Sequence, residues 1–361
     1  MMQVDGGTLV RRFARVAHAN AHRSWTEREG AILELRAGGV LGVGEASPLP
    51  GYSFDDLATC IAELDRCWER LPVLDVDAPV RETLRGAVAR AGVRAPAAVF
   101  ALEAALLDLV SKARGCPAWV ALRGDDQAAP IPLSALAEGA TPEALAEAAA
   151  SACARGIRVV KIKVGGPDGV TRDLPRLAAV RARLGDAVGL RLDANQTLPG
   201  AALRETLEAY AAFGPELLEE PSLPDALALL GASPIPLALD ESLMRDDWRD
   251  RLAAAARAGF LAAVVLKPMT LGGFDRCLSV AEAAHSAGLA VIVTHVFDGP
   301  IGSAAAACLA LAVRGPLMPC GLDAHGRLEH ALAALDQTHI LPFKAHGLGV
   351  DAVTYDEAKA P

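Results

Sequence analysis

Lysines and acids recur at the ends of five successive apolar runs of the sequence. Lys163, Asp193, Glu219, Asp240 and Lys267 follow one another at intervals of 30, 26, 21 and 27 residues. Each interval is about the length of one strand followed by one helix. If each run is a strand of one barrel, the five side chains gather at the carboxyl ends of neighbouring strands, where barrel enzymes build their active sites.

Three carboxylates brought this close would repel one another, and burial would raise their pKa values further. A divalent cation relieves both effects, and ligands that are all oxygen favour a hard ion such as Mg2+. Two of the runs carry adjacent acids, Glu219-Glu220 and Asp240-Glu241. Because neighbouring side chains of a regular strand point to opposite faces, we expect only one acid of each pair to face the site.

The lysines suggest proton abstraction next to a carboxylate. Removal of an α-proton gives an enediolate that a cation stabilises, and a flanking lysine can act as the base. A second ammonium group and the metal charge should lower the pKa of that lysine. Lys163 and Lys267 would face each other across the barrel, and either fits the role. Only six of the 35 basic residues are lysines, and arginine cannot serve as a base near neutral pH.

The elements that position these residues are short apolar runs separated by Ala-rich helical stretches. The runs are apolar throughout, as expected for strands buried on both faces. Eight units of about 20–32 residues predict a parallel (β/α) barrel over residues 126–324. The predicted strands are 131–139, 158–166, 190–196, 217–221, 236–242, 262–269, 290–295 and 319–324.

Residues 1–125 have a different pattern and are predicted to form a separate α+β unit. We expect strands over 9–18, 30–37 and 40–46, with a turn at Gly38-Gly39, and helices over 54–71 and 96–115. The C-terminal stretch 325–361 is predicted to pack back against this unit.

Composition excludes several classes of partner. The formal charge of −9 argues against a nucleic-acid or anionic-membrane surface. Apolar runs such as 301–313 are too short to cross a bilayer. The seven cysteines include no CxxC pair and indicate reduced thiols in a cytoplasmic protein. A small-molecule substrate is the remaining expectation, and the sequence does not determine the oligomeric state.

The motifs KIKVGG, LRLDAN, LEEP, LDESL and VVLKPMTLGG, in this order and spacing, resemble the enolase superfamily in its muconate-lactonising branch. The resemblance implies an α/β fold, a (β/α)7β TIM-like barrel with an N-terminal α+β capping domain, and Mg2+, with Mn2+ as a substitute. Within the branch, GVGEASPLPGYS at 42–53 is similar to the capping-domain loop of o-succinylbenzoate synthases, which typically read GEISPLPGFS.

The resemblance also implies a reaction. Lys163 would remove the proton α to the carboxylate of 2-succinyl-6-hydroxy-2,4-cyclohexadiene-1-carboxylate and then help the hydroxyl group leave. This is a syn-dehydration that gives o-succinylbenzoate for menaquinone biosynthesis. Lys267 would stabilise the enediolate from the opposite face by charge and cation–π contact. The implied metal ligands are Asp193, Glu219 and Asp240.

Further residues would support the site. The resemblance implies that Lys161 assists Lys163, that Arg191 lies beneath the site and that Asn195 lies beside the metal ligands. Gly51 and Ser53 lie on the loop expected to close over the substrate, and His295 could donate a hydrogen bond to a substrate carboxylate. These supporting residues are Lys161, Arg191, Asn195, Gly51, Ser53 and His295.

Other functions remain open at this point. The stretch VTHVFDGPIGS at 293–303 lacks the Ser-rich pattern often found after the seventh strand of these synthases, and Asp298 could instead indicate a cationic substrate. Dipeptide epimerases of the branch hold an ammonium group with an Asp-x-Asp pair, whereas this chain has Asp323 alone. An N-acylamino acid racemase needs two opposed lysines, which are present. A catalytically inactive barrel that binds a ligand is the non-enzyme alternative.

Overall fold

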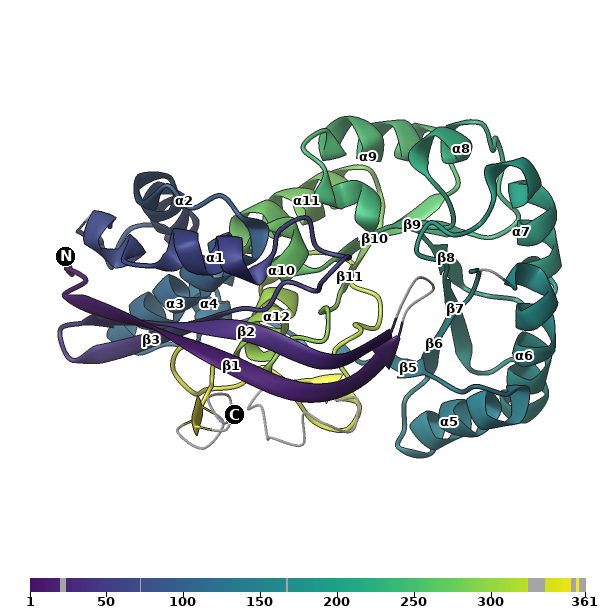
Figure 1. Ribbon diagram of the computed structural model, residues 1–361, viewed down its shortest axis with the longest axis horizontal. Helices are drawn as coiled ribbons and strands as arrows, with labels where there is room; N and C mark the ends of the chain where they lie inside the picture. Colours follow the sequence, from purple (N-terminus) through teal and green to yellow (C-terminus); the bar gives the residue numbers. More distant parts are fainter. Residues whose placement is uncertain (20–23, 72, 167, 324–334, 352–354, 357–361) are drawn as a thin grey trace.

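The computed structural model describes residues 1–19, 24–71, 73–166, 168–323, 335–351 and 355–356, with main chain alone over 13–19. The chain forms an antiparallel sheet with helices on one side of the molecule and a curled parallel sheet ringed by helices on the other (Figure 1). The expected α/β fold, a barrel with an N-terminal α+β unit, is confirmed.

The N-terminal unit is a three-stranded sheet in the order β1-β2-β3 with helices packed on it. The Gly38-Gly39 turn joins β2 to β3, and both glycines have positive φ. The helix expected over 54–71 is wrong in its continuity, because Arg66 adopts a left-handed conformation at φ 54°. The elements are β1 (Gly6–Ala19), β2 (Ser24–Ala37), β3 (Val40–Ala46), α1 (Leu57–Leu64), η1 (Cys67–Arg70), α2 (Val80–Ala91), α3 (Pro96–Arg114) and α4 (Ala118–Arg123).

Helix α3 is the core of this unit and is buried over most of its length. It lies directly against β3, where two glycines permit the approach. A Cβ atom at Gly42 would collide with the main-chain oxygen of Ala105, and one at Gly44 with that of Ala101. The GVG sequence of β3 is therefore a packing requirement of the strand–helix contact, since only glycine lets the two backbones come this close.

Gly44→Ala is expected to destabilise the protein. The added methyl group would displace β3 from α3, and overpacking of this kind costs about 1–3 kcal/mol. Chemical denaturation measures the change in the free energy of unfolding. Gly86→Ala is the matched control, because Gly86 lies in the exposed face of α2 with open space around it. There alanine should stabilise the helix by about 0.5–1 kcal/mol. Equal effects at the two positions would contradict the packing argument.

The barrel contains seven parallel strands in the order β11-β10-β9-β8-β7-β6-β5. Their residues are mostly apolar on both faces, as the sequence pattern predicts, apart from Lys161 and Arg191 in the middle of two strands and the charged residues at the carboxyl ends. The strands are β5 (Ala135–Ala137), β6 (Val159–Lys163), β7 (Gly189–Asp193), β8 (Leu217–Glu219), β9 (Leu237–Leu239), β10 (Leu261–Leu266) and β11 (Ala290–Val293).

Helices follow the strands and cover the outside of the barrel (Figure 1). Short 3-10 turns stand before α7 and after β9. The elements are α5 (Pro142–Ala154), α6 (Gly169–Leu184), η2 (Gly200–Ala202), α7 (Leu203–Ala211), α8 (Pro224–Ala228), η3 (Glu241–Met244), α9 (Trp248–Arg257), α10 (Pro268–Leu271), α11 (Phe274–Ser286) and α12 (Pro300–Ala312).

The eighth predicted strand is not a regular strand. Residues 317–321 make isolated parallel bridges instead, Leu317 to Val291 and Gly321 to Thr294 on one side, and Cys320 to Leu133 on the other. Pro319 has no N–H to donate, which limits the ladder that this short segment can form. Residues 317–321 therefore take the place of an eighth barrel strand and connect β11 to the residues before β5.

The C-terminal residues contact both parts of the molecule. Strand β12 (His339–Ile340) pairs antiparallel with β4 (Ile131–Pro132). The indole of Trp119 donates to the carbonyl of Phe343 at 3.0 Å, and the Leu348 N–H donates to Asp108 of α3 at 2.9 Å. Part of the tail expected to return, 324–334, lies outside the described residues. We retain 1–125 and 126–324 as proposed domain boundaries.

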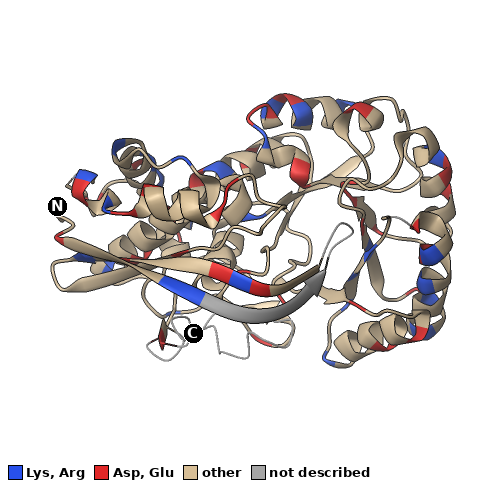
Figure 2. Cartoon of the chain, viewed as in Figure 1, with Lys and Arg blue, Asp and Glu red and all other residues tan. Residues whose placement is uncertain are grey.

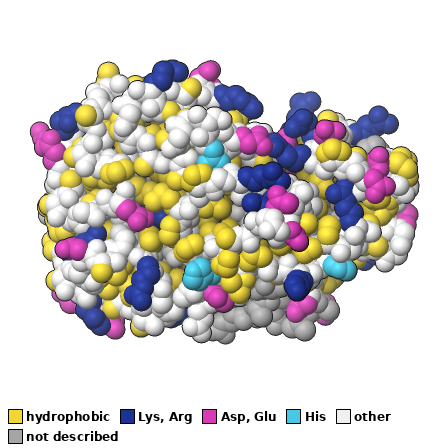
Figure 3. All heavy atoms as spheres, turned by 180° about the vertical axis from the view of Figure 1, so that it is seen from behind, with side chains coloured by type: hydrophobic (Ala, Val, Ile, Leu, Met, Phe, Trp, Pro, Cys, Tyr) yellow, Lys and Arg dark blue, Asp and Glu magenta, His cyan; other side chains and the backbone are white. Residues whose placement is uncertain are grey.

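The surface carries mixed charge. Basic and acidic side chains intermingle on the face seen in Figure 3, with hydrophobic atoms between them. None of the helices that the structure describes has the length and hydrophobicity needed to cross a bilayer.

Candidate functional site

Strand register brings the lysines and acids of the sequence pattern together. Lys163 of β6 is aligned with Asp193 of β7, and Asp193 is aligned with Glu219 of β8. Asp240 follows β9 directly and Lys267 follows β10. Figure 2 shows charged residues as blue and red segments on strands inside the barrel. The five residues thus occupy one end of the barrel, as the intervals in the sequence indicate.

The site is a chain of alternating positive and negative groups. The Lys163 ammonium lies 2.5 Å from Asp193, and the Lys161 ammonium lies 2.6 Å from the same carboxylate and 2.9 Å from Glu219. Lys267 contacts Asp240 and lies 3.7 Å from Glu219. Glu219 therefore stands between two ammonium groups, and each acid of the implied metal site touches at least one lysine.

Burial and neighbouring charge give the three acids different proton affinities. All three are at most 2% exposed. Burial alone would raise the pKa of Asp193, but the adjacent ammonium groups of Lys161 and Lys163 outweigh burial and hold that pKa well below its usual range. Burial and the negative charge of Asp193 raise the pKa of Glu219 to about 7. Burial and the Glu241 carboxylate raise the pKa of Asp240.

The surrounding carboxylates raise the pKa values of two of the lysines. Burial favours the neutral amine of Lys161, yet Asp193 and Glu219 outweigh it and raise the pKa of Lys161 to about 12. The acids around Lys267, chiefly Asp240, likewise outweigh burial and raise its pKa above the usual value. The predicted lowering for the base depends on the metal charge as well as on a second ammonium group, and stays a prediction.

The Glu219-Glu220 pair divides as strand alternation predicts, whereas Glu241 of the second pair stays close to the site because it begins the turn η3 and does not continue the strand. Glu220 points away from the lysines, with φ 38°, and its carboxylate accepts hydrogen bonds from the Asp240 N–H at 2.7 Å and the Ser242 hydroxyl at 2.5 Å. It therefore holds the main chain that carries Asp240. Glu241 accepts from the Asn195 side-chain amide at 2.8 Å.

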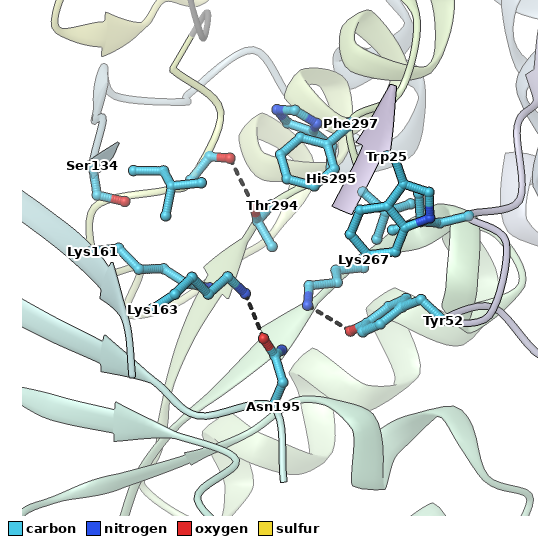
Figure 4. A pocket seen from close by; sticks show the side chains of 14 residues that line it. Trp25, Tyr52, Ser134, Lys161, Lys163, Asn195, Lys267, Thr294, His295 and Phe297 are labelled. Atoms are coloured by element: carbon cyan, nitrogen blue, oxygen red, sulfur yellow. Dashed lines mark hydrogen bonds between the residues drawn. The ribbon is translucent and has the colours of Figure 1, made fainter. Parts of the chain in front are cut away.

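A pocket opens above the lysines (Figure 4). Lys163 and Lys267 extend from opposite sides with their ammonium groups facing each other, while Trp25, Tyr52 and Phe297 lie together on one side. The three carboxylates contact the lysines and are not part of the lining. The lining residues are Trp25, Leu49, Tyr52, Ser134, Leu136, Lys161, Lys163, Asn195, Lys267, Thr294, His295, Val296, Phe297 and Gly321.

Tyr52 is the main functional candidate that sequence reasoning missed. Its hydroxyl accepts from Lys267 at 2.7 Å and donates to Asp240 at 3.1 Å, and Lys267 lies 5.0 Å from its ring centroid. The neighbours Gly51 and Ser53, which the sequence indicated, do not line the pocket. Gly51 has φ 71° and Ser53 accepts from the Leu49 N–H at 2.9 Å, so both shape the turn that presents Tyr52.

The other supporting residues fall into two places. Asn195 lines the pocket and accepts from Lys163 at 2.9 Å. Arg191, aligned with Lys161 and two residues before Asp193 on β7, contacts Glu216 and donates to the Pro319 carbonyl at 2.6 Å. Arg191 therefore ties β7 to the segment that closes the barrel and does not reach the pocket.

The candidate residues that follow the seventh barrel strand, β11, also divide into one that lines the pocket and two that do not. His295 lines the pocket, and its ring packs edge-on to Phe297 at 6.3 Å between centroids. Asp298 is buried beneath the pocket wall, where burial and the Glu45 carboxylate raise its pKa to about 7. Asp323 pairs with Arg155 at 2.5 Å. Neither of these aspartates belongs to the pocket lining.

The three carboxylates suit a hard cation by their chemistry and position. They are buried oxygen donors at the ends of adjacent strands, and each is already in contact with a positive group. As they stand, no three acidic, histidine or cysteine side chains among the described residues are grouped closely enough to hold a metal ion. The reason is that the Lys161 and Lys267 ammonium groups lie between the carboxylates.

The chain is similar to known proteins over most of its length. The family model "Enolase C-terminal domain-like" matches residues 144–356. The chain is 29% identical to muconate cycloisomerase 1 of Pseudomonas putida over 83% of this chain and 80% of that protein. It is 29% identical to an o-succinylbenzoate synthase of Desulfotalea psychrophila over 82% and 86%. It is 31% identical to an L-Lys-D/L-Arg epimerase of Methylococcus capsulatus over 81% and 82%.

A solved structure shows the same fold. The dipeptide epimerase from Enterococcus faecalis, complexed with Mg and the dipeptide L-Leu-L-Tyr, superposes with a TM-score of 0.83 at 22% identity, over 96% of this chain and 99% of that one. The fold therefore agrees with the family match, which covers more than half of the sequence. The chain belongs to the enolase superfamily, in its muconate-lactonising branch.

Proposed function

We propose that the protein is an o-succinylbenzoate synthase that dehydrates 2-succinyl-6-hydroxy-2,4-cyclohexadiene-1-carboxylate. The observation that carries this proposal is the pair of opposed lysines, Lys163 and Lys267, at the base of a pocket closed by the SPLPGYS loop. The o-succinylbenzoate synthases among the relatives, such as that of Desulfotalea psychrophila, support it. Menaquinone biosynthesis and a cytoplasmic location follow from the proposal.

The proposed reaction assigns one task to each lysine. The Lys163 amine takes the proton α to the ring carboxylate, and the C–H electron pair moves into that carboxylate as an enediolate. The enediolate then returns its electrons to the ring, the C–O bond breaks, and the Lys163 ammonium gives its proton to the departing hydroxide. Because one residue serves both steps, the proton and the hydroxyl leave from the same face and the products are o-succinylbenzoate and water.

Lys267 and Tyr52 act from the opposite face. Contact with Asp240 and the Tyr52 hydroxyl fixes the Lys267 ammonium beside the pocket, where it stabilises the negative charge that develops on the substrate. We propose Asp193, Glu219 and Asp240 as the residues that would hold Mg2+, which would supply a further positive charge to the substrate carboxylate. Mn2+, with the same preference for oxygen ligands, is a proposed substitute.

The charge of the lining supports an anionic substrate. Three lysines line the pocket, and among the residues that the structure describes no acid does. The substrate of the proposed reaction carries two carboxylates, which such a lining attracts. A cationic substrate would need an acid in the pocket, but Asp323 pairs with Arg155 and Asp298 does not belong to the lining. This argues against epimerisation of Lys- or Arg-containing dipeptides, the activity named for the Methylococcus relative.

N-acylamino acid racemisation is the second candidate. A racemase needs a base on each side of the α-carbon, and Lys163 and Lys267 face each other across the pocket. An N-acylamino acid is also an anion, so the positive charge of the pocket lining fits a racemase as well as a synthase. The contacts of Lys267 with Asp240 and Tyr52 favour a fixed cation over a second base.

Turnover by the purified protein tests the proposal. With Mg2+ and the cyclohexadiene substrate, we expect loss of the near-UV absorbance of the conjugated diene, with kcat/KM in the usual range of about 10^4–10^8 M⁻¹s⁻¹. N-Acylamino acids and dipeptides are assayed alongside by loss of optical activity. Racemisation without dehydration would reject the synthase assignment and select the second candidate. The absence of both activities would favour a binding protein.

A further inference from the structure

Arg28 of β2 is a buried arginine that donates hydrogen bonds to main chain on both sides of the pocket wall. It is 1% exposed. Its guanidinium donates to the carbonyls of Pro48 at 2.9 Å and Ser47 at 2.5 Å, in the N-terminal unit. It also donates to the carbonyls of Val296 at 3.2 Å and Phe297 at 3.3 Å, in the loop after β11. One side chain thus joins main chain from both parts of the molecule.

The four carbonyls lie directly beside residues that form the pocket. Ser47 and Pro48 immediately precede Leu49, where the turn that presents Tyr52 begins. On the barrel side, Val296 and Phe297 line the pocket themselves. Trp25, three residues before Arg28 on the same strand, donates from its indole to the Pro50 carbonyl at 3.1 Å. Arg28 is therefore placed to fix the turn and the barrel loop against each other.

The barrel loop has a conformation that needs external support. Phe297 has φ 58°, a left-handed conformation that costs of order 1 kcal/mol or more for a residue with a side chain. Its carbonyl accepts from Arg28. Two residues later, the Gly299 N–H donates to Glu45 of β3 at 2.8 Å, and the Gly302 N–H in the first turn of α12 donates to the same carboxylate at 3.0 Å. The loop is thus bound to the N-terminal unit at successive points.

Counter-charges keep the guanidinium positive in this buried position. Burial lowers the pKa of Arg28 to about 10, opposed by the nearby carboxylates of Asp298 and Glu45, so the group stays protonated at neutral pH. Glu45 in turn is paired with Arg12 at 3.0 Å. The cluster of Arg28, Asp298, Glu45 and Arg12 thus contains charges of both signs. Within it, Arg28 and Glu45 bind main-chain groups at the boundary between the N-terminal unit and the barrel.

We propose that Arg28 is a positioning residue that fastens the 47–53 turn to the 294–299 loop and so holds the substrate pocket closed above the lysines. Its planar guanidinium can reach four carbonyls from several directions, whereas a lysine ammonium has three N–H groups on a flexible stem. The consequence for substrate binding rests on the proposed function; the fastening of the two loops does not.

Hydrogen exchange of the substrate-free protein tests the fastening. In Arg28→Lys, which keeps the charge, we expect amides of 49–53 and 294–299 to exchange at least 10-fold faster together, while amides of β6 and β7 are unchanged. Arg181→Lys is the matched control, because Arg181 donates to the carbonyls of Phe213, Val188 and Gly214 far from the pocket. Faster exchange at only one loop, at neither loop, or across the whole N-terminal sheet would overturn the proposal.

Kinetics tests the consequence for the site. Lys163 and Lys267 stay on their barrel strands, but the loosened turn carries Tyr52, which contacts Lys267. We therefore expect Arg28→Lys to raise KM at least 10-fold with a smaller fall in kcat, and Arg181→Lys to leave both unchanged. An unaltered KM, or a fall in kcat alone, would overturn the role in substrate binding. If the wild-type protein does not dehydrate the proposed substrate, the proposed function fails, while the exchange experiment still decides whether Arg28 fastens the loops.

Discussion

Lys163→Ala is expected to abolish exchange of the substrate α-proton with solvent deuterium while the protein stays folded. Lys163 is the proposed base, and removing a positioned base typically costs about 10^2–10^4-fold in rate. The fold should survive because Asp193 keeps the Lys161 ammonium at 2.6 Å as a counter-charge. NMR of the substrate in D2O measures the exchange, and circular dichroism checks the fold.

Two further variants make this experiment decisive. Lys163→Arg keeps a positive charge beside Asp193 but supplies no base near neutral pH, so it should be as inactive as the alanine variant. Lys267→Ala should slow turnover by removing the cation from the opposite face, yet leave some α-proton exchange. Exchange that persists in Lys163→Ala and vanishes in Lys267→Ala would show that the base is Lys267.

Glu219→Gln is expected to remove the stabilisation that Mg2+ gives the wild-type protein. Ligand binding to the folded state adds about 2.7 kcal/mol when the ligand is present at 100 times its Kd. Glu219 is the central acid of the three, so its loss should weaken Mg2+ binding by about 100-fold or more and abolish the metal-induced rise in Tm. Scanning calorimetry with Mg2+ and with EDTA measures this without an activity assay.

Asp108→Asn provides the matched control for Glu219→Gln. Asp108 is also a buried carboxylate with a lysine partner, Lys112 at 2.7 Å, but it lies on α3 away from the barrel mouth. Burial raises its pKa, as at Glu219. Its variant should have a lower Tm, because two N–H donors lose a charged acceptor, and an intact response to Mg2+. A full Mg2+ response in Glu219→Gln would exclude Glu219 as a ligand.

The lysine and acid positions could be predicted because they depend on strand spacing alone. In a parallel sheet, residues at strand ends become neighbours whatever the side chains between them, so the intervals from Lys163 to Lys267 were sufficient. Strand alternation likewise placed Glu220 away from the lysines. These inferences use only the regular geometry of strands, which the sequence pattern specifies.

What escaped prediction depends on loops and on contacts distant in sequence. Tyr52 lies between Gly51 and Ser53, yet no periodicity indicates which side chain of a turn points inward. Arg28 bonds to main chain 269 residues away, and nothing in its local sequence indicates this. The prediction of a regular eighth strand was wrong because a short run containing Pro319 forms isolated bridges instead of a ladder.

Closure of the barrel by residues 317–321 has a consequence for folding during synthesis. Until that segment leaves the ribosome, the edges of β11 and of the stretch before β5 have no neighbour at the eighth position. Open strand edges are prone to pairing with other chains. The nascent barrel is thus exposed to misassembly until most of the chain has been translated.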